Sequence, residues 1–402
     1  MKKSFFGLVL CLIIVAAVFF LVLPSEIERQ LNAVLSTPPY LASPRARTVH
    51  AKLAIVDLHA DSLLWGRDLL SRSHRGHVDV PRLIEGNVAL QVFSLPTKTP
   101  RGLNYERNDD SSDNIFWLAL SQRWPRPTWT SLTERALYQA HRLHQMAARS
   151  RGKFVLILSA QDLNSYVEHR PSERGITAGL LSIEGAHALD GDLENLDILY
   201  NAGYRMMSPS HFFDNDLGGS SAGVQKIGLT EKGKELVRRM EVRHMIIDLA
   251  HASSATIDDV LAVATRPVVV SHTGVKATCN NNRNLSDAQI IGVAKTGGVI
   301  GIGYWETATC GKDARAIVRA MRHVADLVGV EHVALGSDFD GAVIEPFDTT
   351  GLVEITDALL ADGFTEDQVG MIMGRNALKL LKENLSWSPS PSALNARPNA
   401  ER

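Results

Sequence analysis

The stretch Ala54-Ile55-Val56-Asp57-Leu58-His59-Ala60-Asp61 places an apolar, β-type run directly before two potential metal ligands. Residues two apart on an extended chain point to the same side, so His59 and Asp61 are predicted to share one face. Short buried strands that each end in a polar residue are typical of a parallel α/β barrel, whose strand ends meet at one mouth. The stretch therefore predicts the first strand of a barrel and part of a metal site.

The same pattern returns further along the chain. Four more apolar runs each end in a polar side chain: 179–183 before Glu184, 245–250 before His251, 267–271 before His272, and 333–337 before Asp338. A buried carboxylate costs several kcal/mol unless it is paired, so Glu184 requires either a metal or a salt bridge. His251 and His272 would end neighbouring strands. A two-metal hydrolase could use these two imidazoles, the carboxylate of Glu184 as a bridge, and the pair His59 and Asp61. Asp338 would then remain free to exchange a proton.

Candidate strands alternate with candidate helices from Lys52 onward. The strands are expected at 53–57, 88–93, 154–159, 179–183, 204–208, 245–250, 267–271, 298–303 and 332–337, with helices at 131–150, 229–243, 255–264, 286–296 and 313–328. This alternation predicts an α/β fold with a parallel sheet. We expect a (β/α)8 TIM-type barrel in which one of the nine strands is peripheral. A doubly wound open sheet is the alternative, although no glycine-rich phosphate loop follows the first strand.

The N-terminus predicts a membrane segment. An uninterrupted apolar run, 5–23, follows Lys2 and Lys3 and stops at Pro24. At about 1.5 Å per residue this run is just long enough to cross a hydrocarbon core. No small-residue cleavage site follows it, so we expect an uncleaved signal anchor rather than a removed signal peptide. The two lysines favour a cytoplasmic N-terminus, which places the remainder of the chain on the exported, periplasmic or extracellular, side.

The expected organisation has four parts. Residues 1–24 form the transmembrane anchor, 25–50 a proline-containing linker, 51–385 the barrel, and 386–402 a disordered tail. A tryptophan-containing insertion at 97–130 is expected to lie on top of the barrel, where long loops commonly carry function.

Composition and cysteines narrow the choice of partners. The formal net charge of -2 gives no reason to expect nucleic acid. Cys279 and Cys310 would lie in an oxidising compartment, where a disulfide between them would contribute roughly 3–4 kcal/mol. Two unpaired buried thiols are the alternative, but the expected exported location favours the disulfide.

These motifs together resemble the renal (membrane) dipeptidases, a branch of the metal-dependent hydrolases, from about Ala51 to Leu385. The resemblance is carried by Asp57-Leu58-His59-Ala60-Asp61, Ser182-Ile183-Glu184-Gly185-Ala186-His187, Ile247-Asp248-Leu249-Ala250-His251, Ser271-His272, Asn282-Arg283-Asn284 and Ser337-Asp338-Phe339-Asp340-Gly341.

The resemblance implies a (β/α)8 barrel with two Zn²⁺ ions per chain. One zinc would be held by His59 and Asp61 and the other by His251 and His272, with Glu184 bridging both and a hydroxide between them as the nucleophile. The predicted catalytic residues are Asp338, Glu184 and His211, and the predicted substrate-binding residues are His211, Arg283, Asp338 and Tyr304. His211 would polarise the scissile carbonyl, Arg283 would bind the C-terminal carboxylate of a dipeptide, and Asp338 would transfer protons. The resemblance also suggests a homodimer.

Two positions depart from the family pattern. Ala60 stands where the family usually has asparagine, and its side chain should point away from the metals. Phe212 follows His211 where the family has asparagine, which would alter the pocket for the substrate side chain. Two other functions remain open: a barrel hydrolase acting on a lactone, phosphoester or non-peptide amide, and an exported binding protein without catalysis. Arg283 argues against the first alternative, because a substrate without a terminal carboxylate would not need it. The second alternative would be indicated by the loss of metal ligands.

Overall fold

Nine parallel strands form the centre of the protein in this computed structural model, which describes residues 2–173 and 175–387. The strands are β1 (Ile55–Ala60), β2 (Val88–Phe93), β3 (Phe154–Leu156), β4 (Thr177–Ile183), β5 (Tyr204–Met207), β6 (Ile246–Ile247), β7 (Val269–Thr273), β8 (Val299–Ile302) and β9 (Val333–Leu335). Each overlaps one of the nine predicted strands. Eight of them follow the order β6-β5-β4-β2-β1-β9-β8-β7.

The sheet curls until its two ends meet. Asp248, just beyond β6, pairs with Val269 of β7 in a parallel bridge, and the backbone N–H of Leu249 donates to the Val269 carbonyl at 2.7 Å. The side chain of Asp248 also accepts a hydrogen bond from the Ser271 N–H at 2.8 Å. These contacts confirm the predicted TIM-type barrel over the doubly wound alternative.

The ninth strand, β3, lies beside the barrel path. It pairs only with the start of β4, from Phe154 opposite Thr177 to Leu156 opposite Gly179. β5 pairs with the second half of β4, beginning at Leu181. The expectation of one peripheral strand is therefore confirmed.

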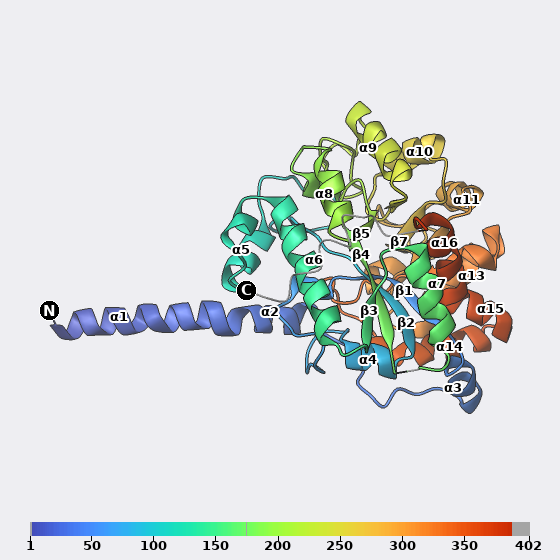
Figure 1. The fold of residues 1–402 in the computed structure, drawn as a ribbon, viewed down its shortest axis with the longest axis horizontal. Coiled ribbons are helices and arrows are strands. Elements are labelled where there is room, and N and C mark those ends of the chain that lie inside the picture. Colours follow the sequence, from blue (N-terminus) through green and yellow to red (C-terminus); the bar gives the residue numbers. More distant parts are fainter. Residues whose placement is uncertain (1, 174, 388–402) are drawn as a thin grey trace.

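Helices cover the outside of the barrel (Figure 1). The longer ones are α6 (Leu132–Arg149), α7 (Ala160–His169), α9 (Glu231–Val242), α10 (Ser254–Val263), α11 (Asp287–Lys295), α13 (Ala314–Val328), α14 (Leu352–Ala361) and α16 (Asn376–Asn384), and the shorter ones are α4 (Val80–Glu85), α8 (Asn195–Asn201), α12 (Glu306–Thr309) and α15 (Glu366–Gly370). In α13, Ile317, Met321 and Val324 recur at helical spacing and are fully buried, so one apolar face packs on the strands. Asp313 caps this helix by accepting the Ala316 N–H at 2.9 Å.

The first part of the N-terminal helix, α1 (Lys2–Ala17), projects away from the barrel, and the helix reaches the barrel at α2 (Leu23–Leu31) (Figure 1). It runs through α1, a π-helical turn (Val18–Val22) and α2 without a break. Phe5–Leu31 is long and apolar enough to cross a membrane, and an N-terminal signal sequence would have the same length and composition.

Residues 25–50 differ from the expected linker because they pack against the barrel. Glu28 is buried and pairs with Arg67 and Arg75, and the Leu35 N–H donates to the Glu345 carbonyl at 2.8 Å. A further helix, α3 (Pro44–His50), lies against α14. The prolines suggested a linker, whereas the residues that bind this segment lie far away in the sequence. The predicted tail lies mostly outside the described residues, at 388–402.

Candidate metal centre

The five predicted metal ligands converge at one end of the barrel. His59 is in β1 with Asp61 just after it, Glu184 follows β4, His251 lies beyond β6, and His272 is in β7. All five side chains are buried. Because parallel strands point their C-terminal ends to one mouth, residues from distant parts of the sequence meet there.

Glu184 is at the centre of this group. Its Oε1 atom lies 3.0 Å from Nε2 of His251, 3.3 Å from Nε2 of His272 and 3.6 Å from Nε2 of His59. Its Oε2 atom lies 3.1 Å from Nε2 of His211. Gly185 allows the chain to turn directly after Glu184, because its φ of 95° is disfavoured for other residues and a Cβ there would clash with the His187 ring.

A second set of atoms lies beside the first. Nε2 of His59 is 3.6 Å from Oδ1 of Asp61 and 3.9 Å from Oδ1 of Asp338. Three overlapping groups could each hold a cation: His59 with Glu184 and His272, Glu184 with His211 and His251, and His59 with Asp61 and Asp338. Glu184 belongs to two of these groups, as expected for a bridging ligand.

The donor atoms fit a divalent cation. Among the residues that the structure describes, Nε2 of His59, Oδ1 of Asp61 and Oε1 of Glu184 are buried without a hydrogen-bond partner. The Ser271 hydroxyl lies 3.2 Å from Nδ1 of His59 and 2.9 Å from Nδ1 of His272, which orients both Nε2 atoms toward Glu184. Buried ligand atoms without protein partners, with imidazole rings oriented by hydrogen bonds at the opposite nitrogen, are typical of a metal site.

Burial and neighbouring groups shift the pKa values of Glu184 and Asp338 in opposite directions. Burial opposes ionisation of Glu184, but the neighbouring imidazoles, including those of His211 and His59, outweigh it and hold its pKa well below the usual value. Burial raises the pKa of Asp338 well above the usual value, and the negative charges of Asp61 and Glu184 add to this effect. Glu184 is therefore favoured as an anion and Asp338 as a neutral acid that can donate a proton.

Two of the site residues have left-handed backbone conformations. φ is 63° at His251 and 68° at Asp338. Such conformations cost non-glycine residues on the order of 1–3 kcal/mol and often occur at functional sites. At both positions the turn comes soon after a strand and directs the side chain into the barrel mouth.

Arg283 lies behind the histidines. Its Nη2 donates to the His272 carbonyl at 2.7 Å, and its guanidinium lies 5.7 Å from the centre of the Trp305 ring. Within the described part of the chain, its buried Nε has no hydrogen-bond partner. A disulfide between Cys279 and Cys310, confirming that prediction, closes the loop that carries Arg283. Asn284 fixes the same loop by donating to the carbonyls of Cys279 at 2.7 Å and Ala308 at 2.9 Å.

Tyr304 is separated from His211 and Asp338, the predicted substrate-binding residues that line the cavity beside Glu184. It is fully buried, and its hydroxyl lies 3.4 Å from Oδ2 of Asp57. Like Arg283, it is not one of the described residues that line the cavity beside Glu184. Its aromatic ring packs against Phe339 and Phe347. In this structure it supports the strand ends.

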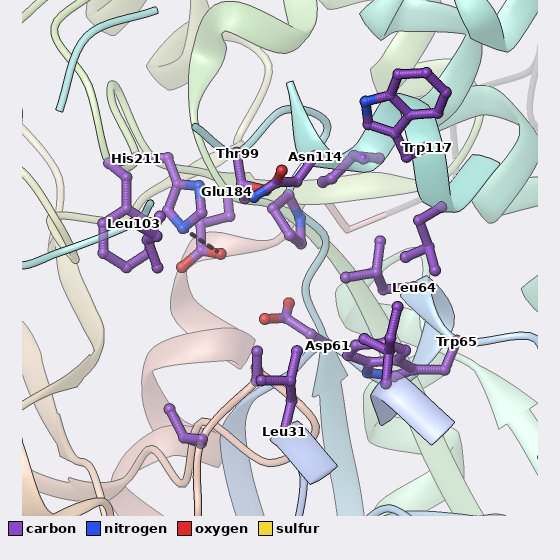
Figure 2. Close-up of a pocket in the computed structure, with 18 of the residues that line it drawn as sticks. Leu31, Asp61, Leu64, Trp65, Thr99, Leu103, Asn114, Trp117, Glu184 and His211 are labelled. Atoms are coloured by element: carbon purple, nitrogen blue, oxygen red, sulfur yellow. Dashed lines mark ion pairs between the residues drawn. The ribbon is translucent and has the colours of Figure 1, made fainter. Parts of the chain in front are cut away.

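A cavity of about 610 Å³ opens from the metal ligands (Figure 2). Figure 2 shows Asp61, Glu184 and His211 pointing into it. Its walls include Phe212, as its departure from the family pattern suggested, and much of the insertion: Thr99, Leu103, Tyr105, Asn114, Ile115, Trp117, Leu118 and Ser121. The insertion, which carries α5 (Asn114–Ser121), thus lies over the barrel mouth as expected.

Two groups of residues stand out among the cavity residues that sequence reasoning missed. The first is Leu64 and Trp65, which directly follow the predicted ligands of β1. The second is a stripe of the N-terminal helix, in which Phe19 and Leu23 belong to the predicted membrane segment and Ile27 and Leu31 to the predicted linker. The proximity of Leu64 to Asp61 was a usable signal, whereas contact between the helix and the barrel has no local signature in the sequence.

Comparisons with known proteins agree with this geometry. The sequence pattern of the family described as membrane dipeptidase (peptidase family M19) matches residues 43–389. Dipeptidase tcpJ of Claviceps purpurea is 28% identical over 321 residues, covering 77% of this chain and 69% of that protein. The crystal structure of dipeptidase AC, a metallopeptidase of family M19, matches with a TM-score of 0.69 at 25% identity, covering 83% of this chain and 99% of that one. A Rhodobacter sphaeroides metallopeptidase, liganded with a phosphinate mimic of the dipeptide L-Ala-D-Ala, shares the fold with a TM-score of 0.66 at 24% identity, over 83% and 99% of the two chains.

Proposed function

The chain belongs to the membrane dipeptidase family and is a metallo-dipeptidase, and we propose that it hydrolyses dipeptides with a free C-terminal carboxylate at a centre of two zinc ions. The observation that carries the proposal is the position of Glu184. Its two carboxylate oxygens lie within 3.6 Å of Nε2 atoms from four buried histidines. A carboxylate in this position can bridge two cations.

The residues divide into two ligand sets and a shared bridge. His59 and Asp61 would hold one zinc, His251 and His272 the other, and Glu184 both. Zinc bound there would supply a hydroxide nucleophile at neutral pH and polarise the carbonyl.

The remaining roles fall to residues around the ligands. Asp338, whose raised pKa favours the neutral acid, would give its proton to the leaving amine. His211 would donate a hydrogen bond to the oxygen of the scissile carbonyl as negative charge develops there. Its Nδ1 atom is buried and has no hydrogen-bond partner among the described residues, so this nitrogen is not committed to another group of the protein.

Arg283 would bind the C-terminal carboxylate of the substrate. A planar guanidinium suits a carboxylate, and the unpaired Nε supplies a free donor. Since the group is buried, a carboxylate partner would compensate its charge at low dielectric. This requirement favours dipeptides over lactones or other neutral-ended substrates. Direct contact of Tyr304 with the substrate remains a prediction, as does a homodimer.

We also propose that the N-terminal helix anchors the protein in a membrane. Lys2 and Lys3 would keep the N-terminus in the cytoplasm and the barrel on the exported side. A reporter active only after export, fused after Pro44, tests this topology. An inactive reporter recovered in the cytosol would contradict it.

Metal analysis combined with a substrate panel tests the catalytic proposal. The purified full-length chain should contain about two zinc equivalents and cleave dipeptides much faster than their C-terminal amides, and it should not cleave lactones or phosphoesters. Zinc removal by a chelator should abolish turnover and zinc addition should restore it. Turnover that survives complete metal removal would contradict the proposal.

A further inference from the structure

The N-terminal helix forms one side of the catalytic cavity. Four apolar residues of this helix line it, each four positions after the last: Phe19, Leu23, Ile27 and Leu31. Residues at this spacing form one stripe along a helix. Figure 2 shows Leu31 in the same cavity as Asp61.

Ion pairs attach α2 to the barrel, while the apolar stripe on α2 remains partly exposed. Glu28 is 1% exposed and forms ion pairs with Arg67 and Arg75, which fixes α2 on the barrel. Leu23, Ile27 and Leu31 are nevertheless 38%, 36% and 42% exposed. The stripe is therefore a fixed apolar wall that faces the cavity.

Apolar residues of the barrel line the same cavity. Leu64 and Trp65 follow Asp61 in the chain, and Ile115, Trp117 and Leu118 come from α5, which packs against α2. The cavity thus joins a polar part at Glu184 with an apolar part at the helix. A substrate whose reacting carbonyl lies at Glu184 can extend an apolar side chain toward the stripe.

We propose that Leu23, Ile27 and Leu31 form a substrate subsite that selects dipeptides with a large aliphatic side chain. The proposal rests on the dipeptidase function proposed above. It gives the N-terminal helix a second role, because a segment that resembles a membrane anchor also determines specificity. The three residues do not touch the reacting atoms, so they act on substrate affinity.

The test compares substrates on the full-length chain in detergent, loaded with zinc. Ala-Ala is compared with dipeptides that carry leucine or 2-aminooctanoate at either position. We expect kcat/KM for at least one large dipeptide to exceed that for Ala-Ala about tenfold or more, mainly through a lower KM, because apolar pockets discriminate on this scale. The double variant Ile27→Ser/Leu31→Ser should lose most of this preference and keep its Ala-Ala turnover.

Two further variants separate the subsite from general effects on the helix. Leu35→Ser, at an exposed residue outside the cavity lining, should behave as wild type. Ile27→Trp should fill the subsite and reject large side chains while sparing Ala-Ala. Retained Ala-Ala turnover shows that each variant is folded.

Two results would overturn the inference: a wild-type enzyme with no preference for large side chains, or a preference that survives both the serine and tryptophan changes. If the zinc-loaded wild type cleaved none of the dipeptides, the proposed function itself would be contradicted. The two failures are therefore distinguishable.

Discussion

The Nε2 atoms of His251 and His272 lie 2.9 Å apart, in a buried site. Burial lowers the pKa of both imidazoles well below the usual value, so both rings are favoured in the neutral form. A neutral imidazole offers one lone pair, and these two rings direct their Nε2 atoms toward the same oxygen of Glu184. A cation at this point would accept both lone pairs, and the first prediction follows from that arrangement.

Glu184→Gln should reduce the zinc content from about two equivalents to one or fewer, because the bridging carboxylate serves both ions. Elemental analysis after dialysis measures the change. Glu345→Gln is the matched control, since Glu345 is also a buried acid without a hydrogen-bond partner in the described chain, but belongs to none of the ligand groups. Two equivalents in Glu184→Gln, or one in wild type, would rule out the bridge.

Asp338→Asn should lower kcat by about 100-fold or more, the usual scale for loss of a general acid or base. KM and zinc content should stay close to the wild-type values, because proton transfer matters only as the bond breaks. Steady-state kinetics with a dipeptide measure both parameters. Near wild-type turnover in this variant would show that another group transfers the proton.

Arg283→Ala should raise KM for dipeptides about 10- to 100-fold, the scale of a lost charge-assisted hydrogen bond. Arg283→Lys should give a smaller increase, because lysine keeps the charge but not the planar pair of donors. An amidated dipeptide, if cleaved, is the control and should show little change. A fall in kcat with unchanged KM would contradict a role in carboxylate binding.

Replacing both Cys279 and Cys310 with serine should lower the free energy of unfolding by about 3–4 kcal/mol, the chain-entropy value for a loop of this length. The same change should raise KM more than it lowers kcat, because the closed loop carries Arg283. Chemical denaturation and dipeptide kinetics measure the two effects. Equal stability with and without the bond would show that packing alone holds the loop.

His50 should make the stability of the protein depend on pH. Burial, helped by the positive charge of Arg47, lowers the pKa of its imidazole to about 4, and the neutral ring bonds to Thr356 and the Gly86 carbonyl. An unfolded histidine has a pKa of about 6.5, so between these two values the unfolded chain binds a proton that the folded chain does not. The free energy of unfolding should therefore fall as the pH decreases from about 6.5 to 4, by about 3 kcal/mol from this residue.

Denaturation of wild type and His50→Gln across this pH range checks that prediction. Contributions from His77 and the other buried histidines are common to both proteins and cancel in the difference. Between these pH values, the slope of the free energy of unfolding against pH should be smaller in the variant than in wild type by about 1.4 kcal/mol per pH unit. If the free energy of unfolding varied with pH in the same way in both proteins, protonation of His50 would not destabilise the folded state.

Much of the fold was readable from local sequence. Each predicted strand overlaps an observed one, because apolar β-type runs bounded by helices leave few other arrangements than a parallel sheet. The candidate ligands were recognisable for a related reason. A histidine or acid that directly follows a buried strand, such as His272 or Glu184, must lie at the mouth of the barrel wherever that barrel closes.

Other features required contacts between segments far apart in the chain. Residues 25–50 resemble a linker in sequence, yet Glu28 is buried because Arg67 and Arg75 compensate its charge. Tyr304 follows a strand like the ligands do, but its hydroxyl is directed to Asp57 and away from the cavity. In both cases the partner decides where the side chain lies.

The sequence by itself determined the strand pattern, the ligand types and the apolar N-terminal helix, because periodicity and the cost of burying charge act over a few residues. Only the tertiary structure decided that Leu23, Ile27 and Leu31 meet the same cavity as Glu184. That contact depends on the docking of the helix, which the Glu28 ion pairs fix at a distance. The sequence shows that Leu23, Ile27 and Leu31 are apolar, whereas the fold determines that they line the cavity.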